Sequence, residues 1–209
     1  MTWSFIRGAL TLVNIESRHL EVSVKGVDEN RNMDRNLLVE TKEFGCYADG
    51  IGLYKGEQVY LAESSLIYQA KAEKRLQDCY KILRAMKESW ISQIRSLIRE
   101  GLPPKDLAIF GSTSFKTETR FYKMDMAGIF RVYEINRMVI PTTRSDFGER
   151  MKACMFCCLE FALLLKNETE NRRNLPEITN IQKIIMAELS KNFPSNISPP
   201  KPKRQKSEL

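Results

Sequence analysis

The chain has 209 residues, of which 43% are hydrophobic and 28% are charged, and these values indicate a globular protein that can bury a core of its own. Its formal net charge is +7, so we expect attraction to polyanions, whether nucleic acid, anionic lipid or acidic protein. No apolar run approaches the roughly 20 residues that span a bilayer, and the N-terminus lacks the pattern of a secretory leader. We therefore expect neither an integral membrane protein nor a secreted one.

The N-terminal part is predicted to consist of strands and loops. Apolar and polar residues alternate over 10–15 and again over 20–25, which predicts a half-buried hairpin. The buried face of its second strand is expected to hold Leu20, Val22 and Val24. The polar residues 27–36 are predicted to form a loop, and a glycine-punctuated stretch at 45–56 leads into a short strand at 58–62.

Two glycine-containing segments superficially resemble phosphate-binding loops. Residues 49–56 lack the Gly-Lys-Ser/Thr ending and follow no convincing buried strand, so a turn or hairpin is predicted there. Residues 111–114, Gly-Ser-Thr-Ser, resemble an anion nest, but no helix clearly begins after them. They are predicted to belong to a polar loop at 111–118.

A long helix is predicted from Ser64 or Ser65, as its N-cap, to Gly101, which precedes two prolines. Because this length exceeds the roughly 8–20 residues typical of globular domains, we expect either a break near Ser89 or a role in self-association. Its predicted apolar stripe consists of Leu76, Cys79, Leu83, Met86, Trp90, Ile94 and Leu97.

The opposite face of this helix carries seven cations against four anions, and it is therefore a candidate polyanion-binding surface. The alternative is a solvated face whose cations pair with neighbouring acids. The candidate residues are Lys71, Lys74, Arg75, Lys81, Arg84, Arg95 and Arg99.

A second hairpin and a further helix are predicted after a short apolar segment, 107–110. Two strand-like runs, 119–126 and 129–140, are joined at Ala127-Gly128, where glycine allows a tight turn. A helix capped by Ser145 or Thr143 then extends to about residue 166 and is apolar on most sides, which predicts the central core helix.

No catalytic or metal site emerges from the sequence. The single histidine, His19, lies in a strand-like segment, far along the chain from the cysteines. Cys154, Cys157 and Cys158 contain a Cys-x-x-Cys spacing, but neither a second ligand pair nor a strand-to-helix turn accompanies it, so core packing is predicted. An odd number of cysteines, three of them crowded together, fits a reducing interior. We expect no enzyme, no cofactor, no metal and no disulfide.

The C-terminal part is predicted to hold an amphipathic helix at 177–191 and then a disordered, proline-bearing basic tail. An import receptor could recognise the cations of such an extended segment, although a nonspecific basic tail is the alternative. The predicted nuclear-localisation residues are Lys201, Lys203, Arg204 and Lys206.

The elements together predict an α+β fold. We expect a small mixed or antiparallel sheet, built from two hairpins and packed by one long helix and two C-terminal helices. Residues 1–193 are predicted to form one globular domain, and residues 194–209 the disordered basic tail.

Residues 106–116, Asp-Leu-Ala-Ile-Phe-Gly-Ser-Thr-Ser-Phe-Lys, and the strand-like residues 129–137 resemble a central stretch of rhabdovirus matrix proteins. The resemblance implies a self-associating α+β domain that condenses the viral nucleocapsid and contacts an anionic membrane surface. Animal-virus members carry a basic N-terminal arm with a proline-tyrosine budding motif. Pro103-Pro104 and Pro199-Pro200 lack the tyrosine here, which together with the basic tail favours a plant-infecting, nucleus-using branch.

Two classes of function remain open at this point. The first is a viral matrix-like structural protein of the host nucleus and the virion, with itself, the nucleocapsid or its RNA, membrane and an import receptor as partners. The second is a nuclear nucleic-acid-associated accessory or regulatory protein, found in nucleus and cytoplasm, such as a suppressor of host defence.

Overall fold

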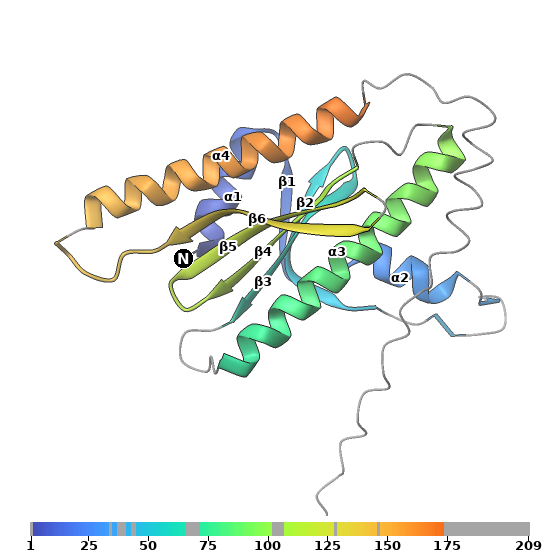
Figure 1. Ribbon diagram of the computed structural model, residues 1–209, viewed down its shortest axis with the longest axis horizontal. Coiled ribbons are helices and arrows are strands. Elements are labelled where there is room, and N and C mark those ends of the chain that lie inside the picture. Colours follow the sequence, from blue (N-terminus) through green and yellow to red (C-terminus); the bar gives the residue numbers. More distant parts are fainter. Residues whose placement is uncertain are drawn as a thin grey trace, which may run out of the picture.

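The computed structural model describes residues 2–33, 35–36, 41–42, 45–65, 72–101, 107–127, 129–145 and 147–173 (Figure 1). These residues form an α+β fold. The strands are β1 (Glu16–Ser23), β2 (Tyr47–Tyr54), β3 (Glu57–Ser65), β4 (Ile109–Phe115), β5 (Glu118–Met126) and β6 (Phe130–Val139). The helices are α1 (Thr2–Leu12), α2 (Lys25–Asn32), α3 (Ala72–Glu100) and α4 (Phe147–Arg173).

The six strands form one sheet in the order of the chain, β1-β2-β3-β4-β5-β6. All neighbours are antiparallel except β3 and β4, which are parallel. A parallel pair needs a long crossover connection, and α3 lies in that connection. The α+β class is thus confirmed, while the sheet is larger than the two predicted hairpins would make.

Helices cover both faces of the sheet, α1 and α4 on one and α3 with α2 on the other (Figure 1). Alternating side chains of each strand therefore enter different hydrophobic clusters. On β3, Tyr60 packs in the cluster with α1 and α4, whereas Leu61 packs in the cluster with α3. The side toward α1 and α4 is called the α1–α4 face below, and the side toward α3 the α3 face.

The predicted N-terminal hairpin is wrong. Residues 2–12 form α1, in which Ile6, Ala9 and Leu10 are buried at helical spacing. β1 pairs with β2 instead, and a bulge between His19 and Val22 interrupts the register. Leu20 lies in this bulge with a φ of 75° and is 80% exposed, so it is not part of the buried face that alternation predicted.

Of two further segments in the N-terminal half, one differs from the prediction and one confirms it. The loop predicted over 27–36 is wrong in part, because residues 25–32 form the helix α2. The hairpin expected within 49–56 is confirmed, because β2 and β3 are joined by Lys55 and Gly56, with φ of 50° and 84°. Two successive positive φ angles are typical of the tight turn that matches strand twist.

The predicted long helix is present, but it is shorter than predicted and is not broken. Ser64 and Ser65 belong to β3, and α3 begins at Ala72. The helix continues through Ser89, so the predicted break there is wrong. Of the predicted stripe, Met86, Trp90, Ile94 and Leu97 are buried, but Leu76 is 73% exposed because the buried residues of α3 begin only at Asp78.

The predicted polar loop at 111–118 is wrong, since most of it forms the buried strand β4. A Cβ added to Gly111 would lie 2.5 Å from Met86 Sδ, so the small residue lets α3 approach the sheet closely. The second hairpin is confirmed by the pairing of β5 with β6. Residue 128, at the predicted turn of this hairpin, lies outside the described residues.

The predicted helix is confirmed as α4, but it ends later, at Arg173, and is buried on one side only. Its inner side buries Cys154, Cys157, Cys158, Phe161, Ala162 and Leu165. Its outer side stays exposed, so the helix covers one face of the sheet and is not buried all round, as a central core helix would be.

No helix within the described ranges is long and apolar enough to cross a membrane. The predicted helix at 177–191 and the predicted tail lie outside the described residues.

Candidate functional site

The predicted cations of the N-terminal half of α3 are held by acidic side chains. Lys74 Nζ lies 2.5 Å from Asp78 Oδ1, and Lys81 Nζ lies 2.8 Å from Glu63 Oε1. The hydrogen bond to Asp78 raises the pKa of Lys74. Lys71 lies outside the described residues. These ion pairs match the alternative that the cations pair with neighbouring acids.

Both acids, Glu63 and Asp78, are buried, with exposed fractions of 4% and 3%, and sequence reasoning did not predict a buried charge cluster. Burial raises the pKa of Glu63 from 4.5 to about 7, against the lowering effect of Lys81. The signal that could have found Glu63 is its parity with Leu61 on β3, since alternate residues of a strand share a face. Perturbed carboxylates also mark catalytic sites, but here each acid is bonded to a lysine.

Arginines from three elements converge on one carboxylate at the α3 face. Arg75 Nη2 of α3 donates to Glu118 Oε1 at 3.0 Å, Arg120 Nε of β5 donates to the same oxygen at 2.5 Å, and Arg137 Nη2 of β6 donates to Glu118 Oε2 at 2.5 Å. Arg120 also pairs with Glu134 at 3.2 Å. Arg75, Arg120 and Arg137 around Glu118 are called the arginine cluster below.

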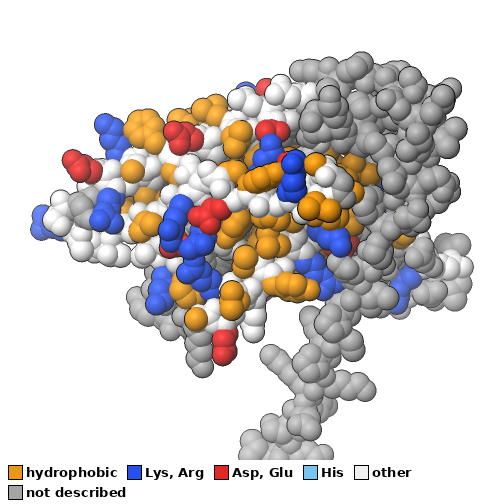
Figure 2. Space-filling model, in the orientation of Figure 1, with side chains coloured by type: hydrophobic (Ala, Val, Ile, Leu, Met, Phe, Trp, Pro, Cys, Tyr) orange, Lys and Arg blue, Asp and Glu red, His pale blue; other side chains and the backbone are white. Residues whose placement is uncertain are grey.

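The arginine cluster is positive and open to solvent. Burial raises the pKa of Glu118, but the hydrogen bonds from Arg120 and Arg137 outweigh it, so the net pKa is lowered and the acid is held ionised. The side chains of Arg75, Arg120 and Arg137 are 39%, 30% and 50% exposed. Each can therefore still reach an anion from outside. On the face shown in Figure 2, Lys and Arg side chains are spread among Asp, Glu and exposed hydrophobic side chains.

The cations at the C-terminal half of α3 belong to a different environment. Arg95 donates to Asn30 of α2, which in turn donates to Glu88. Arg99 Nε donates to the carbonyl oxygen of Arg95 at 3.3 Å, and Arg84 also has an interaction partner. Of the predicted polyanion-binding residues that the structure describes, only Arg75 belongs to the arginine cluster. Sequence reasoning missed Arg120 and Arg137, which lie far from α3 along the chain.

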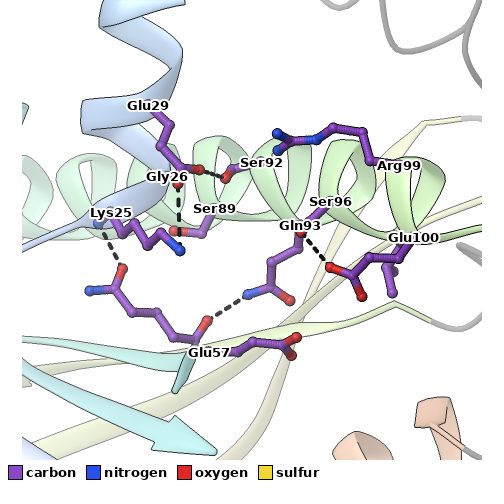
Figure 3. Close-up of a pocket in the computed structure, with 12 residues that line it drawn as sticks. Lys25, Gly26, Glu29, Glu57, Ser89, Ser92, Gln93, Ser96, Arg99 and Glu100 are labelled. Atoms are coloured by element: carbon purple, nitrogen blue, oxygen red, sulfur yellow. Dashed lines mark hydrogen bonds and ion pairs between the residues drawn. The ribbon is translucent and has the colours of Figure 1, made fainter. Parts of the chain in front are cut away.

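A polar cavity of about 470 Å³ lies between α2, the β2–β3 turn and α3 (Figure 3). Ser92 donates to Glu29, Ser96 donates to Glu100, and Gln93 donates to the carbonyl oxygen of Gln58. Ser89 Oγ is buried there and has no hydrogen-bond partner among the described residues. Acidic and basic side chains are mixed around the cavity, and Glu29 and Glu100 are already bonded to Lys25 or to serines, so its lining selects no particular ligand chemistry.

The single histidine is exposed on β1, whereas the three clustered cysteines are buried. His19 stacks against Trp3, with ring centroids 6.2 Å apart. Cys154, Cys157 and Cys158 are buried among hydrophobic side chains, and burial raises the pKa of Cys157 to about 11 and of Cys158 to about 12. Among the described residues, no group of three or more His, Cys, Asp or Glu side chains is arranged to hold a metal ion.

The opposite side of the sheet carries an apolar groove of about 520 Å³ between α1 and α4, called the α1–α4 groove below. Only one of its lining residues, Lys152, is charged. The predicted nuclear-localisation residues Lys201, Lys203, Arg204 and Lys206 lie outside the described residues.

Comparison with known proteins adds no family to this description. No protein-family model, no curated protein and no solved structure matches the chain. Its function therefore has to be inferred from the two surfaces, the arginine cluster and the α1–α4 groove.

Proposed function

We propose that the chain is a non-enzymatic, matrix-like structural protein that binds the viral nucleocapsid through exposed arginines and associates with itself. The arginine cluster is the observation that carries the proposal. Arg75, Arg120 and Arg137 surround Glu118, and within the described ranges Glu134 is the further acid bonded to this group. Three cations against two anions leave a positive surface at the α3 face.

Guanidinium groups suit phosphate because their fork of N–H donors matches two phosphate oxygens. The ion pairs with Glu118 hold the three side chains in place before a ligand arrives, so less side-chain entropy is lost on binding. A phosphodiester chain that approaches this surface would share the guanidinium donors with Glu118. This supports RNA or nucleocapsid as the polyanion, read by charge and not by base sequence.

The arrangement of the two surfaces supports the structural role. The arginine cluster and the α1–α4 groove lie on opposite faces of one sheet, so RNA binding and an apolar contact need not compete. A protein that must hold a nucleocapsid on one side and another protein or a membrane on the other requires such a separation. Membrane contact and nuclear import through the basic tail remain parts of the proposal.

The test is RNA affinity as a function of salt, with full-length protein and single-stranded RNA. Changing Arg75→Gln and Arg137→Gln together removes two cations while Arg120 still holds Glu118. At about 0.7 per contact, the slope of log affinity against log salt should flatten by about 1.4. The thermal midpoint should stay within a few degrees of the parent, since both side chains are substantially exposed.

The matched control is Arg131→Gln. Arg131 is 44% exposed and lies on the same strand as Arg137, but it is bonded to Asp125 away from the arginine cluster. This control should retain the parental salt slope. Equal slopes for the parent and the double variant would reject the arginine cluster as the polyanion site.

A further inference from the structure

The α1–α4 groove combines a hollow floor with exposed apolar walls. Its floor includes Gly8, where an added Cβ would meet nothing within 4 Å. Its walls include Met155 and Phe156 of α4, which are 59% and 55% exposed, and Leu12 of α1, which is 76% exposed. A contiguous apolar surface of this kind is unfavourable in water and typically marks a binding site.

The charges around Phe156 indicate what binds there. Lys152 and Glu160 are both exposed and lie four residues before and four residues after Phe156. Residues at this spacing share one side of a helix. If two copies of α4 cross antiparallel at Phe156, Lys152 of each copy faces Glu160 of the other. The sequence around Phe156 is therefore complementary to itself in charge.

We infer that the α1–α4 groove is the site at which a second copy of this chain binds, with α4 antiparallel to α4 and centred on Phe156. The exposed wall of each copy then fills the hollow of the other across a two-fold axis, as in isologous dimers. The inference rests on the self-association in the proposed function and names the surface that performs it.

The same charges disfavour the other candidate occupants. An anionic membrane favours a surface of uniform positive charge, whereas the exposed side of α4 around Phe156 carries Glu160 as well as Lys152. A nucleic acid would gain little from the apolar side chains that line the groove. A second copy uses the apolar surface and both charges at once.

Charge exchange tests the inference, with sedimentation equilibrium of the full-length protein as the measurement. Lys152→Glu and Glu160→Lys should each weaken self-association by about ten-fold, because each creates two like-charge contacts across the two-fold axis. The two variants mixed in equal amounts should associate with each other as tightly as the parent does with itself. The chain that carries both changes should also recover the parental affinity.

Phe156→Ser should weaken self-association more strongly, by about thirty-fold or more, since it removes the central contact of both copies. Leu76→Ser is the matched control, because Leu76 is 73% exposed but lies on α3. It should leave the dimer unchanged. Glu160 also accepts a hydrogen bond from Asn136 at 3.5 Å, so the thermal midpoint of each variant is measured alongside.

Three outcomes would overturn the inference: a monomeric parent at all concentrations, single variants that associate like the parent, or a mixture no tighter than its components. Binding of the parent to phosphatidylcholine vesicles containing phosphatidylserine, lost in Phe156→Ser without any change in oligomeric state, would assign the groove to a membrane. In each case the salt-dependent RNA affinity is measured separately, so failure of the dimer surface is distinguishable from failure of the arginine cluster.

Discussion

At the scale of single residues, Glu63 is a buried carboxylate whose pKa is strongly raised. It is 4% exposed on β3 and is paired with Lys81, and its burial raises the pKa from 4.5 to about 7. A folded-state pKa above the unfolded value means that the folded protein binds this proton more tightly. The contribution of Glu63 to stability is therefore largest at low pH and is lost as pH rises toward 7.

Replacing Glu63→Gln should remove this dependence. The effect belongs to the range between the ordinary pKa of 4.5 and the folded-state pKa of about 7. Between pH 5 and pH 7, the free energy of unfolding of the variant should therefore fall less steeply with pH than that of the parent. Urea denaturation at a series of pH values measures it. Glu57→Gln, at a half-buried position of the same strand, is the control, and a variant curve parallel to the parental one would contradict the assigned cause.

At the scale of elements, Gly26 allows α2 to pack closely against the backbone of α3. A Cβ at Gly26 would lie 2.6 Å from Ser89 Cα and 2.9 Å from Ser89 N. Because these are backbone atoms, no side-chain rotation can relieve the overlap. Asn30, bonded to both Glu88 and Arg95, then fixes α2 along the same helix.

Gly26→Ala should therefore destabilise the protein by about 1–3 kcal/mol, through displacement of α2 from α3. Gly8→Ala provides the contrast, since its Cβ meets open space in α1, and it should stabilise by about 0.5–1 kcal/mol through helix propensity. Chemical denaturation of both variants measures the difference. Equal stabilities would show that α2 is not packed as described.

The elements also show where sequence reasoning succeeds. The β5–β6 hairpin and α4 were predicted because alternation and helical periodicity are local signals that the fold did not override. Residues 10–15 were predicted as a strand because their apolar residues alternate, yet Leu10 continues the helical face of Ile6. Residues 111–114 were predicted as a loop because glycine and serine favour turns, while in the structure their small size admits α3.

At the scale of the whole molecule, the sheet brings together residues that no local pattern connects. The arginine cluster draws on α3, β5 and β6, and it exists because α3 crosses from β3 to the parallel strand β4 and so lies over β5. Among its described residues, the predicted cationic face of the long helix contributes only Arg75 to this cluster. Spacing along one helix could not reveal Arg120 and Arg137, whose positions depend on strand pairing.

The two surfaces together define the central claim, which is that one chain binds RNA by charge while it binds a second copy by apolar contact. Salt should separate these two interactions. Electrostatic contacts with phosphate weaken steeply as salt rises, whereas burial of apolar surface does not.

The most direct test is sedimentation velocity of the purified protein with labelled single-stranded RNA at low and at high salt. We predict that at low salt the RNA sediments with several copies of the chain, and that at high salt the RNA is released while the protein remains larger than its 24.2 kDa monomer. RNA that sediments alone at low salt, beside a protein that stays monomeric in both conditions, would contradict the account.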